Sequence, residues 1–242
     1  MRCIQFTDPH IGMPGDDTFD VDVRANFQKV LAAIANENAD HVILTGDLCF
    51  REPRPEIYNW VHEAIADSGL DIRIIPGNHD DQHMMGEIFG MSPTDEREIY
   101  SIQDLGGKRC LLLDTGAGQM SEPQWSWMLE ALAQASDPLL IFMHHPPVLC
   151  DVPYMDRKHS FTQMARFQAR VQELERPVHV FCGHYHVDRT VSFGNLHVHV
   201  TPSTFFQINP GNPEFEVDHY RIGYRRIFVT EGSVITSVVY LD

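Results

Sequence analysis

The chain has 242 residues, with 34 acidic and 18 basic side chains and a formal net charge of −16. A long nucleic acid would on average be repelled, so the composition argues against that partner, although a small anion could still bind beside metal cations. The five cysteines are scattered and form no C-x-x-C pair, which argues against a secreted disulfide framework and favours reduced thiols.

No apolar signal core follows Met1, and no apolar run is long enough to cross a bilayer. We therefore expect a cytoplasmic protein without a membrane partner. The length fits one domain over residues 1–242.

Short β-like runs alternate with helical patterns over most of the chain. The expected strands end in clusters of Gly, Asp, Asn and His, and they cover residues 3–6, 41–45, 72–76, 109–113, 139–143 and 178–182. Apolar residues at helical spacing predict two helices early in the chain. Their buried faces are Phe27, Val30, Leu31 and Ile34 in the first, and Ile57, Trp60, Val61, Ala64 and Ile65 in the second.

Two later helices carry a start signal. Ser121 with Gln124, and Ser160 with Gln163, both fit the capping box that opens many helices. The buried faces predicted behind these signals are Trp125, Met128, Leu129 and Leu132, and then Met164, Phe167, Val171 and Leu174.

From about residue 190 the helical patterns stop. Four β-like segments follow, at residues 196–201, 204–208, 220–229 and 234–241, and residues 209–213 read as a long turn between two of them. Units of strand and helix followed by a β-rich portion predict an α/β fold.

Five turns that end or follow expected strands carry side chains able to bind a metal. They are Asp8-Pro9-His10, Gly46-Asp47, Gly77-Asn78-His79-Asp80, His144-His145 and Gly183-His184-Tyr185-His186. Sites collect at the carboxyl ends of strands in α/β sheets, and glycine lets the backbone approach an ion closely. Each turn alone would be an ordinary solvated turn. Together they predict a metal centre held by Asp8, His10, Asp47, Asn78, His144, His184 and His186.

Other candidate ligands have simpler interpretations. His197 and His199 lie inside an alternating strand without a turn, so we expect them to share one face as packing or solvent-facing residues. His145 is expected to support the site or to pack. Asp81 and His83 open a possible helix and receive no metal role. His41, His62, His159, His179 and His219 have no ligand-like neighbours.

With the five turns in this order, the sequence resembles the calcineurin-like metallophosphoesterases, whose signature is D-x-H, G-D, G-N-H-[DE], H and G-H-x-H. The resemblance extends from Phe6 to at least His186. Thr201-Pro202-Ser203-Thr204 and Gly223-Tyr224-Arg225 look like bacterial class III cyclic-nucleotide phosphodiesterases, with Ile222 where that group usually has proline.

The resemblance implies two metal ions, each Fe, Mn or Zn. Asp8, His10, Asp47 and His186 would hold one, Asp47, Asn78, His144 and His184 would hold the other, and Asp47 would bridge them. It also implies a four-layer α/β/β/α sandwich of two mixed β-sheets.

Two ions about 3.5 to 4 Å apart can convert a shared water to hydroxide and clamp the phosphoryl oxygens. No serine elbow or cysteine loop is apparent, so no protein nucleophile is expected. Asn78 and His79 are the expected substrate-binding and catalytic residues. His79 would stabilise the phosphoryl charge or protonate the leaving alkoxide, and Asp80 could orient it from behind.

We expect the substrate to be a small phosphodiester, with 3′,5′-cyclic AMP or a related cyclic nucleotide as the leading candidate. Glycerophosphodiesters and phosphomonoesters are alternatives on the same site. A non-catalytic interaction scaffold is an alternative of another class, against which the complete ligand set argues.

Three further features stay open at this point. Phe205, Phe206, Tyr185 and Tyr154 could stack on a base, but such residues are more often plain core or surface. Residues 148–159 could cover the metals or form an ordinary connection. The β-rich tail could form the interface of a possible homo-oligomer.

Overall fold

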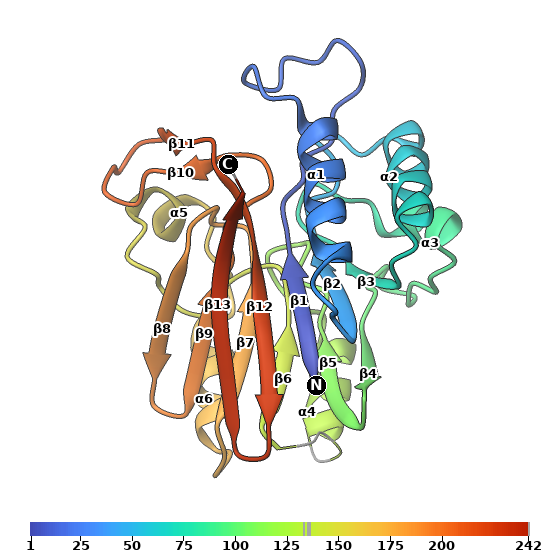
Figure 1. Cartoon of the computed structure of the whole chain (residues 1–242). Helices are drawn as coiled ribbons and strands as arrows, with labels where there is room; N and C mark the ends of the chain where they lie inside the picture. The colour runs from blue at the N-terminus through green and yellow to red at the C-terminus, as the bar shows by residue number, and fades with distance from the viewer. Residues whose placement is uncertain (133, 135–136, 242) are drawn as a thin grey trace.

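Two large β-sheets pack face to face between helices in this computed structural model, which describes residues 1–132, 134 and 137–241 (Figure 1). The four-layer α/β/β/α architecture expected above is thereby confirmed. In chain order the elements are β1 (Arg2–Phe6), α1 (Val23–Ala35), β2 (His41–Thr45), α2 (Pro55–Ser68), β3 (Ile72–Ile75), α3 (Gln82–Phe89), β4 (Ser101–Leu105), β5 (Lys108–Leu112), α4 (Glu122–Leu132), β6 (Leu139–Phe142), α5 (Pro153–Lys158), α6 (Met164–Gln172), β7 (Val178–Cys182), β8 (Arg189–Phe193), β9 (Leu196–Val200), β10 (Gln207–Ile208), β11 (Val217–His219), β12 (Ile222–Thr230) and β13 (Ser233–Leu241).

The first sheet has the strand order β13-β12-β1-β2-β3, and the second has β4-β5-β6-β7-β9-β8. β1, β2 and β3 run parallel, as do β5, β6, β7 and β9, whereas β12, β13, β4 and β8 pair antiparallel. The two parallel groups bring several strand ends together at one end of the molecule, where loops of both sheets meet.

The inner faces of the two sheets form an apolar core. Cys3 and Ile43 of the first sheet belong to the same buried cluster as Phe142 and Phe181 of the second, whose rings stack at 5.3 Å between centroids. The opposite strand face packs on helices, as where Phe6 contacts Phe27 of α1. Burial on both faces explains why the central strands are almost wholly apolar.

The carboxyl-terminal hairpin completes the first sheet, because β12 pairs with β1. Arg225 of β12 is buried, and its guanidinium donates hydrogen bonds to Thr201 Oγ1 at 2.9 Å and to Asp188 Oδ1 at 2.8 Å. The backbone N–H of Gly223 donates to the carbonyl of Ser203 at 3.3 Å. The two tail motifs noted in the sequence therefore form one packed unit.

One predicted helix start is confirmed, whereas two other helix predictions are wrong. Ser121 Oγ accepts a hydrogen bond from the Gln124 N–H at 3.2 Å, so this start signal is confirmed. The Ser160 signal is wrong, because α6 begins after Gln163, whose side chain instead contacts Met120 and Trp125. Leu129 was predicted to be buried but is 41% exposed.

Some strands also differ from the predictions. β4 and β8 were not predicted, because edge strands with mixed exposure carry no clear apolar pattern. The short helix α5 and the short strand β11 were not predicted either. The segment predicted as a strand at 204–208 pairs only at Gln207 and Ile208. Thr204, at the start of this segment, instead makes a hydrogen bond to the turn after β1, where its N–H donates to the Thr7 carbonyl. Among the described helices, none has the length and apolar character needed to cross a membrane.

Candidate metal centre

The seven predicted ligand residues lie together at the carboxyl ends of five strands. Asp8 and His10 follow β1, Asp47 follows β2, Asn78 follows β3, His144 follows β6, and His184 and His186 follow β7. Six of them are buried and Asn78 is exposed. The turns predicted from sequence therefore meet at one place.

The backbone at this place is unusual. Five of the seven residues have a positive φ: Asp8 at 53°, His10 at 44°, Asp47 at 54°, His184 at 67° and His186 at 50°. Side chains other than glycine rarely adopt this left-handed conformation, which costs free energy. Strain concentrated on these residues indicates that their placement serves a function.

Two glycines allow the turns to approach one another. A Cβ atom at Gly77 would lie 2.2 Å from Oδ1 of Asp47, and one at Gly183 would lie 2.5 Å from Oδ2 of Asp8. Neither distance is compatible with a side chain. Glycine at these positions therefore brings the backbone against the two carboxylates.

The candidate ligand atoms form two groups that share Asp47. In the first, His10 Nε2 lies 3.1 Å from His186 Nε2 and 3.6 Å from Asp47 Oδ2, and His186 Nε2 lies 3.6 Å from Asp8 Oδ1. In the second, His144 Nε2 lies 3.4 Å from the other oxygen of Asp47, Oδ1.

Asn78 and His184 complete the second group. Asn78 Oδ1 lies 3.1 Å from His144 Nε2. One ligand atom from each of Asp47, His144 and His184 can be chosen within 4.8 Å of the others, and the same holds for Asp8, His10 and His186. Each group thus has the dimensions of a site for one metal ion.

Backbone carbonyls fix the orientation of three imidazoles. Nδ1 of His144 bonds the carbonyl of Thr45 at 2.8 Å, and Nδ1 of His186 bonds that of Phe206 at 3.0 Å. Nε2 of His184 bonds the carbonyl of His159 at 2.8 Å. A carbonyl oxygen can only accept a hydrogen bond. In each of the three rings the bonded nitrogen therefore carries a proton, and the opposite nitrogen faces the candidate metal position.

Charge at the site also fits a bound cation. Burial raises the pKa of Asp8 to about 7, with a partly opposing effect of His144. Burial also opposes ionisation of Asp47, but the charge of His144 and its hydrogen bond outweigh burial and hold the pKa of Asp47 well below the ordinary value. Burial lowers the pKa of His10 and His184 well below their ordinary range, which keeps these imidazoles neutral. Burial also lowers the pKa of His144, but the Asp47 carboxylate outweighs burial and raises that pKa to about 9. The buried carboxylates thus attract positive charge, which a metal ion would supply in place of the proton on His144.

His79 lies at the rim of the centre, but Asp80 does not orient it as predicted. Nδ1 of His79 bonds the carbonyl of Arg51 at 3.1 Å, and its backbone N–H donates to Asp47 Oδ1 at 2.9 Å. The Asp80 carboxylate instead accepts from the N–H groups of Gly77 and Leu48. Asp80 therefore ties together the turns after β2 and β3.

Three other histidines differ in their relation to the centre. Nδ1 of His145 bonds Thr115 Oγ1 at 3.1 Å, and its ring stands nearly perpendicular to that of His144, so the two imidazoles diverge. His199 is buried against Phe181, away from the centre. His159 was given no role, yet its carbonyl orients His184 and its side chain borders the centre.

A cavity of about 280 Å³ opens beside the two groups of candidate ligands. We call it the aromatic cavity, because five phenylalanines line it together with Tyr154: Phe19, Phe50, Phe205, Phe206 and Phe215. Arg51 is the one Lys or Arg side chain among its described lining residues. Tyr185, considered above as a stacking residue, is fully buried and lies outside the lining.

A second cavity of about 300 Å³ adjoins the same centre, and we call it the polar cavity. It shares Asn78, His159 and His184 with the aromatic cavity, and Lys158 and His145 also line it. Residues 153–159, which include α5, therefore border both cavities. No sequence pattern indicated Phe19, Phe215 or His159, because only the folded loops bring them to the centre.

Carboxylate, amide and imidazole groups gathered at parallel strand ends are typical of metal-dependent hydrolases. A family model for the calcineurin-like phosphoesterases matches residues 1–188, and the chain belongs to this family. The protein is thus a metallophosphoesterase that needs metal ions.

Relatives agree with this assignment. A protein of Fibrobacter succinogenes, described as a probable cyclic nucleotide phosphodiesterase, is 32% identical over 98% of this chain and 92% of its own length. The glycerophosphodiester phosphodiesterase GpdQ of Enterobacter lignolyticus is 28% identical over 78% of this chain and 71% of its own. A dimetal phosphatase from Danio rerio has the same fold, with a TM-score of 0.69 and 11% identity over 98% of both chains.

Proposed function

We propose that the protein hydrolyses a small phosphodiester, with a 3′,5′-cyclic nucleotide such as cyclic AMP as the leading substrate, at a centre of two metal ions. The observation that carries the proposal is the position of Asp47, whose two carboxylate oxygens face two separate groups of ligands. Asp8, His10, Asp47 and His186 would hold one ion, and Asp47, Asn78, His144 and His184 the other. Fe, Mn and Zn all suit this mixture of carboxylate, amide oxygen and imidazole.

Metal ions bound there would supply the Lewis acidity that activates water and stabilises the phosphoryl oxygens. The protein contributes the rest. Carbonyl oxygens fix the imidazoles, so the lone pairs are aimed before the substrate arrives. Asn78 is exposed at the centre and can also contact the phosphoryl group.

His79 is proposed as the residue that stabilises the developing charge or protonates the leaving alkoxide. Its Nδ1 is engaged by the Arg51 carbonyl, which leaves Nε2 for the substrate. Its ring lies 5.0 Å from that of His10, centroid to centroid, and it lines the aromatic cavity. This position is adjacent to the proposed metal groups.

The aromatic cavity favours a diester over a monoester. A phosphodiester carries one negative charge and a monoester up to two, and Arg51 is the single guanidinium in the described lining. Apolar rings beside the centre also match an organic group on the phosphate. The Fibrobacter relative described as a probable cyclic nucleotide phosphodiesterase supports the same substrate class.

A glycerophosphodiester is the second candidate. The polar cavity favours it, because Lys158 and His145 offer polar groups to a hydroxylic alcohol. The relative named GpdQ points to the same class of substrate.

The test is to purify the protein under controlled metal supply, measure metal per chain, and assay four substrates side by side. Cyclic AMP, cyclic GMP, a glycerophosphodiester and an aryl monoester would be compared. We expect two metals per chain, highest kcat/KM on a cyclic nucleotide, and loss of activity after chelation. No turnover of any substrate with two metals bound would overturn the proposal and favour an interaction scaffold.

We also propose a cytoplasmic location, supported by five buried cysteines without a disulfide. Two further points stay predictions: that the β-rich tail forms the interface of a homo-oligomer, and that residues 1–242 form one domain.

A further inference from the structure

Five phenylalanine side chains meet on one side of the proposed metal centre. We call them the phenylalanine wall: Phe19, Phe50, Phe205, Phe206 and Phe215. They come from four separate loops, so no single element of secondary structure explains their meeting. The wall reaches the ligands, because Phe205 lies 5.4 Å from His10 and Phe206 lies 5.2 Å from His186, ring centroid to centroid.

Phe19 is the centre of the wall. Its ring lies within 5.2–6.4 Å of those of Phe50, Phe205, Phe206 and Phe215, centroid to centroid. It belongs to the loop between β1 and α1, the long blue loop at the top of Figure 1. Its φ of 56° is one that an aromatic side chain rarely adopts. The loop therefore turns this ring toward the cavity at a conformational cost.

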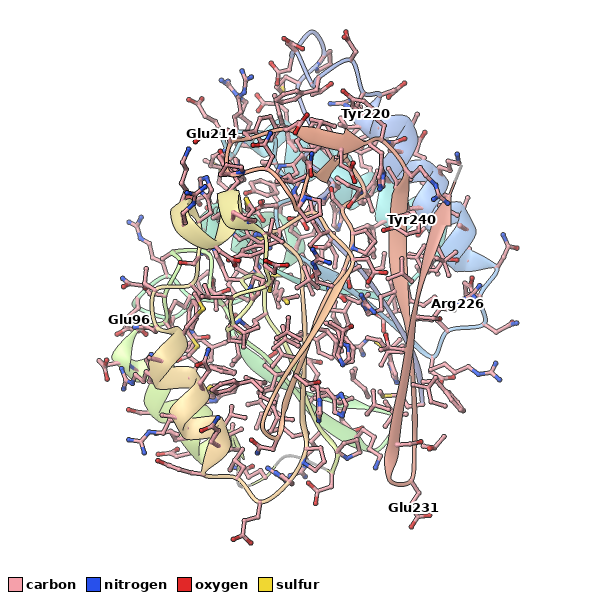
Figure 2. The ribbon with its side chains drawn as sticks, turned by 90° about the vertical axis from the view of Figure 1, so that its left-hand side faces the viewer. Glu96, Glu214, Tyr220, Arg226, Glu231 and Tyr240 are labelled. Atoms are coloured by element: carbon pink, nitrogen blue, oxygen red, sulfur yellow. The ribbon has the colours of Figure 1, made fainter. Side chains whose placement is uncertain are left out.

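Phe215 continues the wall toward α5, since its ring contacts those of Phe19 and Phe206 at 5.9 and 5.8 Å between centroids. Its loop is held to α5, since Lys158 Nζ lies 3.1 Å from Glu214 Oε2 and the ring of Tyr154 lies 5.7 Å from that of Phe215. Figure 2 shows Glu214 directly above this helix. Two loops distant in sequence thus place aromatic rings at one cavity mouth.

Core packing does not account for these two rings. Phe19 is 37% exposed and Phe215 is 40% exposed, although both line the same cavity. Large apolar groups that converge and remain in contact with water are typical of a ligand site. Flat aromatic ligands pack well on such rings, by stacking or edge-to-face contact.

We propose that the phenylalanine wall is the nucleobase subsite, with Phe19 and Phe215 as its specificity-determining residues. This inference rests on the proposed function, because it assigns the base of the substrate to one side of the same centre. The phosphodiester would lie at the proposed ligands, and the base would pack on the exposed surfaces of the Phe19 and Phe215 rings, which contact each other at 5.9 Å between centroids. The polar cavity shares His159 with the aromatic cavity, and its described lining contains no Phe, Tyr or Trp.

The test compares two substrates that differ only in the base: cyclic AMP and the same 3′,5′-cyclic phosphate on a ribose without a base. Variants are Phe19→Ala, Phe19→Leu, Phe19→Tyr and Phe215→Ala. We expect each Ala variant to raise KM for cyclic AMP about 5- to 150-fold, the range for loss of one base-stacking ring. Turnover of the abasic substrate should be unchanged, Phe19→Tyr should resemble wild type, and Phe19→Leu should resemble Phe19→Ala.

Phe193→Ala is the matched control, because Phe193 on β8 is 43% exposed and does not line the cavity. The base subsite would be overturned if wild type had equal kcat/KM for both substrates and the Phe19 and Phe215 variants left these values unchanged. The diesterase activity would then remain established. If neither substrate is hydrolysed, the proposed function fails instead. Calorimetric titration of the metal-loaded protein with adenosine then decides the subsite: binding weakened by Phe19→Ala supports it, and no binding to wild type overturns it.

Discussion

Arg225 Nε donates a hydrogen bond to Thr201 Oγ1 at 2.9 Å and thereby joins the terminal hairpin to the segment that follows β9. That segment continues to Ser203, whose hydroxyl donates to the carbonyl of Asp8 at 2.9 Å. It then reaches Phe206, whose carbonyl orients His186. The hairpin is thus connected through a few hydrogen bonds to the proposed metal ligands, although it contributes no ligand itself.

Replacing Arg225 with Met should lower the free energy of unfolding by about 1.5–3 kcal/mol, because charge-assisted bonds to Thr201 and Asp188 would be lost. Urea unfolding measures the change. Arg226→Met is the adjacent control, since Arg226 lies at the surface (Figure 2), where ion pairs contribute about 0–1 kcal/mol. An equal or larger loss in the control would contradict the role given to Arg225.

Asp47→Asn should remove bound metal and reduce kcat about 10²–10³-fold or more, because one neutral oxygen cannot serve two metal groups. Elemental analysis and cyclic AMP hydrolysis give the two measurements. Asp71→Asn removes the same charge at an exposed position and should behave as wild type. Full metal content with normal turnover in Asp47→Asn would refute the bridging assignment.

His79→Ala should retain metal but slow turnover, most strongly for diesters with poor leaving groups. A series of diesters with leaving alcohols of graded acidity would show a steeper dependence on leaving group than wild type. His83→Ala is the control, since its side chain is 70% exposed on α3. Equal slowing across the series would rule out an acid role.

Acid should destabilise the protein partly through the stacked histidines on β7 and β9. Burial lowers the pKa of His199 to about 3, with Arg225 and His179 adding to the effect, and burial with His197 lowers that of His179 to about 4. The folded state then binds fewer protons than the unfolded state, where the pKa is near 6.5. The contribution of neutral His179 and His199 to the free energy of unfolding is therefore present above about pH 6.5 and is lost as the pH falls toward 4.

His199→Gln should reduce that loss. Urea unfolding at pH 7 and at pH 4.5 would show a smaller difference than in wild type, whereas the exposed control His83→Gln should show the wild-type difference. If His199→Gln leaves the difference in unfolding free energy between pH 7 and pH 4.5 unchanged, the prediction is contradicted.

The sequence was most informative where a property is local. Each ligand turn combines a strand end with glycine or a metal-binding side chain, and parallel strands bring such ends to one edge, so the meeting of Asp8, Asp47 and His144 could be predicted. Apolar alternation and spacing likewise located most strands and helices. The assignment of Asp8, Asp47 and His144 as metal ligands stays a proposal.

Other features depend on contacts that no local pattern encodes. Phe19 and Phe215 reach the cavity because two loops fold over it, and His159 contributes a backbone atom that any residue would carry. β4 and β8 were missed because edge strands bury little of either face. Asp80 was given the wrong partner, since adjacency in sequence to His79 does not place its carboxylate beside the ring.

The acceptors that orient His144, His184 and His186 are all main-chain oxygens, those of Thr45, His159 and Phe206. Side chains at these three positions can therefore be exchanged without removing the hydrogen bond that aims each imidazole. Two of the three, His159 and Phe206, also face the aromatic cavity. The same residues can thus change what the cavity accepts while the reactive centre keeps its geometry, so substrate preference can diverge among relatives on a common chemistry.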